Sequence, residues 1–84
     1  MSNSSNVQGV ISEEEWSGLS KKKKLKALYA KGEEIFGDRK RFNTWLRRRS
    51  YPLGNIYPID QVKTVAGITL IYDELIRIEF GATA

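Results

Sequence analysis

Cysteine and histidine are both absent from this sequence of 84 residues. A chain of this length buries only a little over half of the surface that its unfolded form exposes, so its hydrophobic core is thin. Small domains often reinforce such a core with disulfides or a structural metal, and this chain has neither of the residue types that most often supply them. Its stability must therefore come from close helix packing, from self-association, or from both.

The same two absences bear on chemistry. They remove most pairs of nucleophile and base and the commonest metal ligands. The carboxylate pairs Glu33–Glu34 and Asp73–Glu74 are sequence neighbours on expected helices, so the members of each pair point in different directions and do not converge as catalytic carboxylates must. The sequence also contains no glycine-rich phosphate-binding motif. We therefore predict a protein that is not an enzyme and that uses no cofactor or metal.

Neither export nor membrane insertion is indicated by the sequence. The first residues, Met-Ser-Asn-Ser-Ser-Asn, are polar and uncharged, unlike a signal peptide. No apolar run approaches the roughly 20 residues that a membrane-spanning helix needs. We expect a cytoplasmic protein without a membrane partner.

Apolar residues recur at helical spacing in three stretches, which predicts an all-α fold, a small compact bundle of four to five short helices. Isoleucine is frequent after residue 64 and would also suit strands, but Asp73 and Glu74 interrupt any strict alternation. The inward-facing residues of the three stretches are expected to be Leu25, Leu28, Tyr29, Ile35 and Phe36, then Phe42, Trp45 and Leu46, then Ile68, Ile71, Tyr72, Leu75 and Ile76.

Residues with a preference for helix ends delimit these helices. Ser12 and Glu15 have the spacing of a capping box. Gly37 suits a helix end, the stretch 50–57 reads as a loop, and Pro58 suits the first position of a short helix reaching about residue 63. Three further N-caps are predicted at Ser20, Asp38 and Thr64.

Charge is unevenly distributed along the chain. Residues 1–49 carry 12 basic and 6 acidic side chains, whereas residues 50–84 carry 2 basic and 4 acidic ones. The first turns of the helix after Ser20 hold a run of lysines, where cations oppose the helix dipole. These lysines are either a solvated helix face or a surface for DNA, and the candidate DNA-binding residues are Lys21, Lys22, Lys23, Lys24 and Lys26.

An ordered series of short motifs occupies residues 33–81. The series is Glu-Glu-Ile-Phe-Gly-Asp, Trp45-Leu46, Leu53-Gly54, Pro58-Ile59, Gly67 and finally Leu75-Ile76-Arg77-Ile78-Glu79-Phe80-Gly81. Through their order, their spacing and the closing Arg-Ile-Glu-x-Gly, they resemble the Xre/MbcA/ParS antitoxin toxin-binding domain. Residues 1–11 are rich in serine and asparagine and have little to bury, so we expect a flexible N-terminal tail over 1–11. The resemblance then implies a toxin-binding domain over 33–84, preceded by an abbreviated N-terminal helical segment over 12–32.

This resemblance implies an antitoxin of a type II toxin–antitoxin system. Its cognate partner would be a RES-type toxin, which consumes NAD, and the antitoxin's last helix and C-terminal tail would occlude the toxin's active site. A homodimer or a toxin–antitoxin hetero-oligomer is expected. The residues that the resemblance assigns to toxin binding are Arg77, Ile78, Glu79, Phe80, Gly81, Ala82, Thr83 and Ala84.

Two other functions remain open on the sequence alone. Longer relatives often carry a DNA-binding region ahead of this domain, and here residues 12–32 are at most a remnant of it. The basic N-terminal half would then make the chain a small DNA-binding transcriptional regulator. The second alternative is an orphan domain that scaffolds other proteins, or one that counteracts a host's antitoxin by mimicry. The segment Arg47-Arg48-Arg49-Ser50-Tyr51 is more basic than the corresponding loop of the family, which indicates a different local partner surface.

Overall fold

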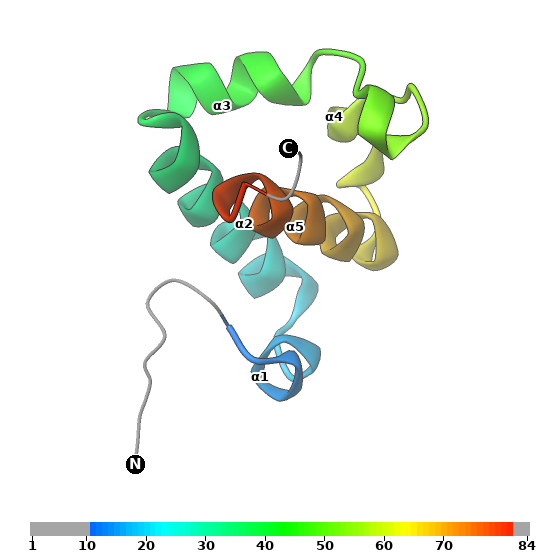
Figure 1. Ribbon diagram of the computed structural model, residues 1–84. Coiled ribbons are helices and arrows are strands. Elements are labelled where there is room, and N and C mark those ends of the chain that lie inside the picture. The colour runs from blue at the N-terminus through cyan, green and yellow to red at the C-terminus, as the bar shows by residue number, and fades with distance from the viewer. Residues whose placement is uncertain (1–10, 82–84) are drawn as a thin grey trace.

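The computed structural model of the chain describes residues 11–81. Five α-helices and one 3-10 helix follow one another (Figure 1), namely α1 (Glu13–Ser17), α2 (Lys21–Phe36), α3 (Arg39–Leu46), η2 (Tyr51–Leu53), α4 (Pro58–Gln61) and α5 (Val65–Glu79). The predicted all-α fold of short helices is confirmed for this part of the chain. The expected tail lies outside the described residues except for Ile11, which packs against the core.

The helices begin where the capping residues predict. Ser12 and Glu15 form the expected capping box, in which each side chain bonds the other's backbone amide. The Asp38 carboxylate accepts a hydrogen bond of 2.7 Å from the amide of Arg41. The side chains of Ser20 and Thr64 accept amides in the same way. Each cap satisfies a backbone N–H that the helix leaves unpaired, which contributes about 0.5–2 kcal/mol.

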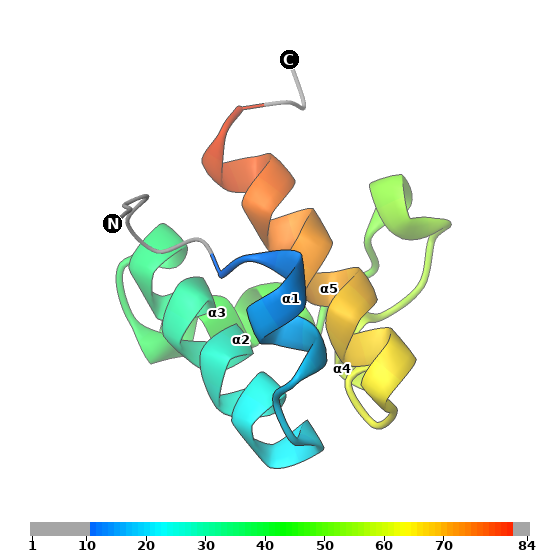
Figure 2. The same cartoon turned by 90° about the horizontal axis from the view of Figure 1, so that it is seen from below.

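The core lies where α2 and α5 pack against each other. Figure 1 shows α2 and α3 wrapping one side of α5, with α4 at the start of α5, and Figure 2 shows α1 crossing in front of α2 and α5. The predicted inward face of α5 is confirmed for four residues, whereas Ile76 is half-buried. The buried apolar residues are Trp16, Leu28, Phe42, Leu46, Ile68, Ile71, Tyr72 and Leu75.

Two glycines allow close approach between elements. A Cβ at Gly32 on α2 would overlap the ring of Phe42 on α3, so the absence of a side chain at Gly32 lets α3 come close to α2. A Cβ at Gly67 would overlap the carbonyl group of Gln61, where α4 ends beneath the first turn of α5. Both positions therefore require the absence of a side chain for packing.

Aromatic side chains of α1 and α3 pack against α2 and α5. Trp16 of α1 stacks on Tyr72 with ring centroids 4.3 Å apart, and its Nε1 donates to Oγ1 of Thr69 at 2.9 Å. On the other side, Trp45 of α3 packs with Phe36 and Phe42 at centroid distances of 5.6 and 6.0 Å. Within residues 11–81, no helix combines the length and apolarity that crossing a membrane requires.

Candidate functional site

The C-terminal end of α5 carries most of the described residues that the sequence assigns to binding. Figure 2 shows the last turns of α5 extending towards the C-terminus beyond the neighbouring helices. Phe80 ends the helix, and its side chain is 67% exposed. The amide of Gly81 donates to the carbonyl of Ile78 at 3.1 Å, and Gly81 adopts a φ of +71°, which favours glycine. The chain therefore turns directly after an exposed aromatic side chain.

Glu79 anchors this end of α5 to α2. Its Oε1 lies 3.0 Å from Nζ of Lys31, and Oε1 of Glu34 lies 3.3 Å from the same nitrogen. Burial by itself lowers the pKa of Lys31, but hydrogen bonds to Glu79 and Glu34 outweigh it, so this pKa is raised. Lys31 is almost fully buried and remains charged. The side chain of Glu79 is thus occupied inside the fold.

A second ion pair orders the preceding turn. Nη2 of Arg77 lies 3.1 Å from Oε1 of Glu74, and Nε of Arg77 donates to the same oxygen at 3.2 Å. Glu74 is buried, whereas more than half of the Arg77 side chain is exposed. Arg77 therefore neutralises a buried carboxylate and presents the remainder of its guanidinium to solvent.

A cleft separates the C-terminal half of α5 from the segment that follows α3, and Figure 2 shows η2 beside this half of the helix. Its volume of about 270 Å³ is enough for one or two side chains and is below the roughly 300–1,000 Å³ of small-molecule sites. The arrangement suits contact with a protein. Its lining residues are Trp45, Arg48, Arg49, Ser50, Tyr51, Pro52, Glu74 and Ile78.

The loop that forms one wall of this cleft is held closed by backbone hydrogen bonds. The amide of Ser50 donates to the carbonyl of Ile56 at 2.7 Å, and the amide of Asn55 donates to the carbonyl of Ser50 at 2.8 Å. The guanidinium of Arg49 lies over the ring of Tyr57 at 5.5 Å. Tyr51 is 79% exposed at the edge of the cleft, so the loop presents an aromatic side chain on the same side as the end of α5.

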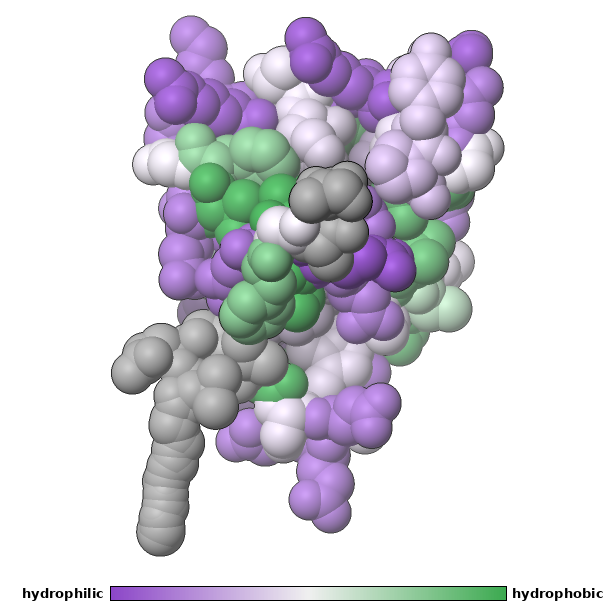
Figure 3. Space-filling model, viewed as in Figure 1, coloured by the Kyte–Doolittle hydropathy of each residue, from purple (hydrophilic) through white to green (hydrophobic). Residues whose placement is uncertain are grey.

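Tyr51 and Trp45 were not among the residues predicted for binding. Trp45 follows the apolar spacing of α3 and was assigned to the core, which it does contact while also lining the cleft. The sequence signal for the cleft was the unusually basic segment ending at Tyr51. Figure 3 shows apolar surface beside the end of α5 with hydrophilic surface around it. The surface is therefore mixed, as protein contact sites commonly are.

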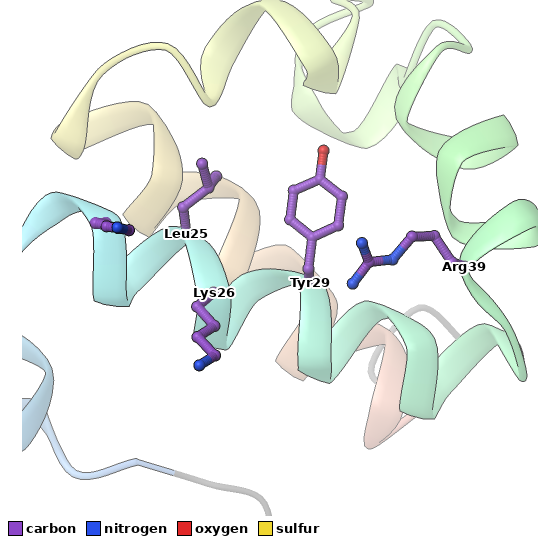
Figure 4. A pocket seen from close by; sticks show the side chains of 5 residues that line it. Leu25, Lys26, Tyr29 and Arg39 are labelled. Atoms are coloured by element: carbon purple, nitrogen blue, oxygen red, sulfur yellow. The ribbon is translucent and has the colours of Figure 1, made fainter.

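The lysines proposed for DNA binding do not form one continuous face. Lys24, expected on the solvent side of α2, is instead buried, with its Nζ 5.9 Å from the centre of the Trp16 ring. Nζ of Lys21 donates to the carbonyl of Lys63 at 2.7 Å. The remaining three are exposed, and Lys22 and Lys26 line a groove on α2 (Figure 4), whereas Lys23 does not.

The last three residues of the predicted binding segment, Ala82, Thr83 and Ala84, lie outside the described residues. Among residues 11–81, no cluster of acidic side chains has the arrangement to hold a metal ion. The described residues thus form an end of α5 that is held by the Lys31–Glu79 ion pair and that exposes Phe80. A narrow cleft lined in part by Arg48 and Arg49 lies beside the same helix.

Comparison with known protein families finds a match, and it covers the segment that contains the cleft and the end of α5. Residues 31–81 match the antitoxin Xre/MbcA/ParS C-terminal toxin-binding domain. No curated protein and no solved structure matches the chain significantly. The matched range covers more than half of the chain, from the buried Lys31 to Gly81, and so includes the cleft and both ion pairs of α5. By this match, the chain belongs to the Xre/MbcA/ParS family of antitoxins and contains its C-terminal toxin-binding domain.

Proposed function

We propose that this protein neutralises a RES-type toxin, an enzyme that consumes NAD, by covering the toxin's active site with the end of α5 and the residues that follow. The family supplies the antitoxin role and the toxin partner. The RES type of the toxin, the occlusion of its active site and a cytoplasmic site of action are our extension, in line with the sequence resemblance. One observation carries the proposal, namely the exposed Phe80 on a helix end that Lys31 and Glu79 fasten in place.

The anchoring supports an inhibitory contact because it reduces the entropy lost on binding. A helix end whose direction is already set loses less freedom when a partner docks on it. Large aromatic side chains at the centre of an interface often carry much of the binding free energy. Phe80 fits this description because little of its surface is used within the fold.

The predicted binding residues then divide into two groups. Glu79 and Arg77 act mainly by holding α5 in position through Lys31 and Glu74, while Arg77 keeps exposed donors for the partner. Phe80 and the residues after it make the contact with the toxin. Ala82, Thr83 and Ala84 have small side chains, which suits entry into a narrow active-site cleft.

Exposed apolar residues elsewhere on α5 support the predicted homodimer or toxin–antitoxin hetero-oligomer. Val65 is 42% exposed and Leu70 is 39% exposed. A helix with apolar side chains outside its core-facing stripe suits a second buried face in an assembly. Sedimentation of the chain, alone and with its toxin, measures this directly, and a monomer in both samples would exclude it.

Co-expression with a RES-type toxin encoded beside this chain tests the proposed function. The toxin alone should lower cellular NAD and stop growth, and the wild-type chain should restore both. Phe80→Ser should lose this rescue, because it removes the exposed anchor. Tyr57→Ser is the matched control, since it removes another exposed aromatic side chain that lies outside both the cleft lining and the end of α5, and it should still rescue. Full rescue by Phe80→Ser, or failure of the wild-type chain to restore NAD, would refute the proposal.

A further inference from the structure

A second surface lies on α2, away from the cleft beside α5. It is a groove of about 450 Å³ lined by Lys22, Leu25, Lys26, Tyr29 and Arg39, and its wall is mostly apolar. Figure 4 shows the side chains of Leu25 and Tyr29 on the same side of α2, with Arg39 of α3 reaching towards Tyr29. The guanidinium of Arg39 lies 5.1 Å from the centre of the Tyr29 ring. Three cationic side chains thus line the groove together with Leu25 and Tyr29.

The two lysines of this groove differ from their neighbours Lys21 and Lys24 in the contacts that they make within residues 11–81. Lys21 caps the carbonyl of Lys63, and Lys24 covers Trp16, so both of these lysines are used internally. Lys22 and Lys26 are exposed, and within residues 11–81 neither forms an ion pair. Cations in the first turn of a helix oppose its dipole, so Lys22 in particular costs some helix stability.

Arg39 is held in place at the edge of the groove. Its Nε donates to Oε2 of Glu33, and its guanidinium stacks on Tyr29. The ion pair offsets part of the charge of Arg39, so Lys22 and Lys26 supply the uncompensated positive charge. A partner that fits must therefore bring carboxylates to the lysine side of the groove and an apolar group to the side of Leu25 and Tyr29.

We infer that this groove docks an acidic segment of another protein, which places an apolar side chain on Leu25 and Tyr29 and carboxylates beside Lys22 and Lys26. Charge complementarity selects this occupant, and the apolar wall of the groove favours it over duplex DNA. DNA presents a charged backbone that needs no apolar wall, and the burial of Lys24 interrupts the lysine run that DNA would contact. None of the five lining residues lines the cleft beside α5.

Most of the groove also lies ahead of the family-matched range. Four of its five lining residues precede residue 31, and only Arg39 falls within the match. The groove is thus a feature of this chain's N-terminal segment rather than of the toxin-binding domain. Its partner is independent of the proposed toxin contact, and its test needs no toxin.

The test measures binding of the full chain to a labelled synthetic peptide by fluorescence anisotropy. The peptide combines leucine and glutamate at the spacing of an amphipathic helix. Three probes serve as comparisons: a scrambled peptide of the same composition, a peptide with lysine in place of glutamate, and duplex DNA. Lys26→Glu removes a groove cation, and Lys23→Glu is the matched control because it makes the same charge change on an exposed lysine outside the groove.

Lys26→Glu should weaken binding of the amphipathic peptide by about tenfold or more, equivalent to about 1.4 kcal/mol, and Lys23→Glu by less than about threefold. The scrambled and lysine-containing peptides should bind more weakly than the amphipathic one. The inference is overturned by no binding of the amphipathic peptide, by equal losses in the two variants, or by tighter binding to duplex DNA than to the peptide.

Discussion

Nζ of Lys31 on α2 lies 3.0 Å from Oε1 of Glu79 in the last turn of α5. The two residues are 48 positions apart in the sequence, and the lysine is almost fully buried. Their ion pair joins the two principal helices at the end where α5 presents Phe80. The direction of the exposed helix end therefore depends on a charge placed inside the fold.

Replacing Lys31 tests the stabilising role of this pair. Lys31→Met keeps an unbranched apolar stem but removes the charge that Glu79 and Glu34 share. We expect a loss of roughly 1–3 kcal/mol in the free energy of unfolding, less than the 3–5 kcal/mol for a fully buried pair because both carboxylates stay partly hydrated. Urea denaturation measures the change. Glu34→Gln should cost less, since more than half of that side chain is exposed, and an unchanged stability in Lys31→Met would disprove the role.

Stability should fall at alkaline pH through two groups. Hydrogen bonds in the fold raise the pKa of Lys31 above its ordinary 10.5 despite burial, and burial raises the pKa of Tyr72 above 10.0 despite the nearby Lys31 charge. Both groups hold their protons more tightly in the folded chain than in the unfolded chain. Their contributions are complete below these ordinary values and are lost as the pH rises through the folded pKa values.

Denaturation at pH 7 and at about pH 11 measures this effect. The wild-type chain should be less stable at the higher pH, and Tyr72→Phe should lose less stability between the two values. A wild-type stability that stays constant or increases over this interval would contradict the raised pKa values of Lys31 and Tyr72.

Gly67 should tolerate no side chain. Gly67→Ala gains up to about 1 kcal/mol in helix propensity, but its Cβ would overlap the backbone carbonyl of Gln61, which has no flexible end to move away. We expect a net loss of about 1–3 kcal/mol from forcing α4 and α5 apart. Gly18→Ala is the control, because its Cβ would have ordinary contacts and its φ is negative. Thermal unfolding compares them, and equal midpoints would contradict the close contact.

Substitutions at Arg77 and Phe80 should differ in their effect on the stability of the fold. Arg77→Glu places a second carboxylate beside the buried Glu74, so it should lower the midpoint of thermal unfolding by several degrees, in line with about 1–3 kcal/mol. Phe80→Ser changes an exposed side chain and should leave the midpoint within about 2 °C of the wild type. Scanning calorimetry of both variants measures these midpoints. A larger loss in Phe80→Ser than in Arg77→Glu would mean that Phe80 supports the fold.

The helices were predictable because their signals are local. Ser12, Ser20, Asp38 and Thr64 each bond an amide three residues further along, so a few neighbouring positions suffice to recognise them. The C-terminal ends of the helices were predicted less exactly than their N-terminal ends. The helix that begins at Pro58 finishes at Gln61 rather than about residue 63, because no local signal marks its end.

The buried charges were not predictable, because their environment comes from distant segments. Lys24 is covered by Trp16 of α1, and Lys31 is paired with Glu79 of α5. A lysine on a helix normally indicates a solvated face, and only the tertiary packing reverses that interpretation. The prediction that Asp73 and Glu74 point in different directions is confirmed, since Asp73 is exposed and Glu74 is buried.

The cleft was only partly predictable for the same reason. Trp45, Tyr51 and Ile78 come from three separate elements that meet after folding. The sequence drew attention to the closing motif at Arg77–Gly81 and to the basic segment before Tyr51, but it contained no sign that these two would be neighbours. Toxin contact by the closing motif stays a prediction.

Inhibition of a purified RES-type toxin tests the central claim most directly. NAD consumption is followed at several NAD concentrations with the full chain and with a chain that ends at Phe80. The full chain should raise the apparent KM for NAD without changing kcat, since occlusion of the active site excludes the substrate. The shortened chain should still bind the toxin but inhibit at least about tenfold less, because the tail that fills the site is missing. Equal inhibition by both chains, or a reduced kcat with an unchanged KM, would contradict the proposal that the end of α5 and its tail occupy the active site.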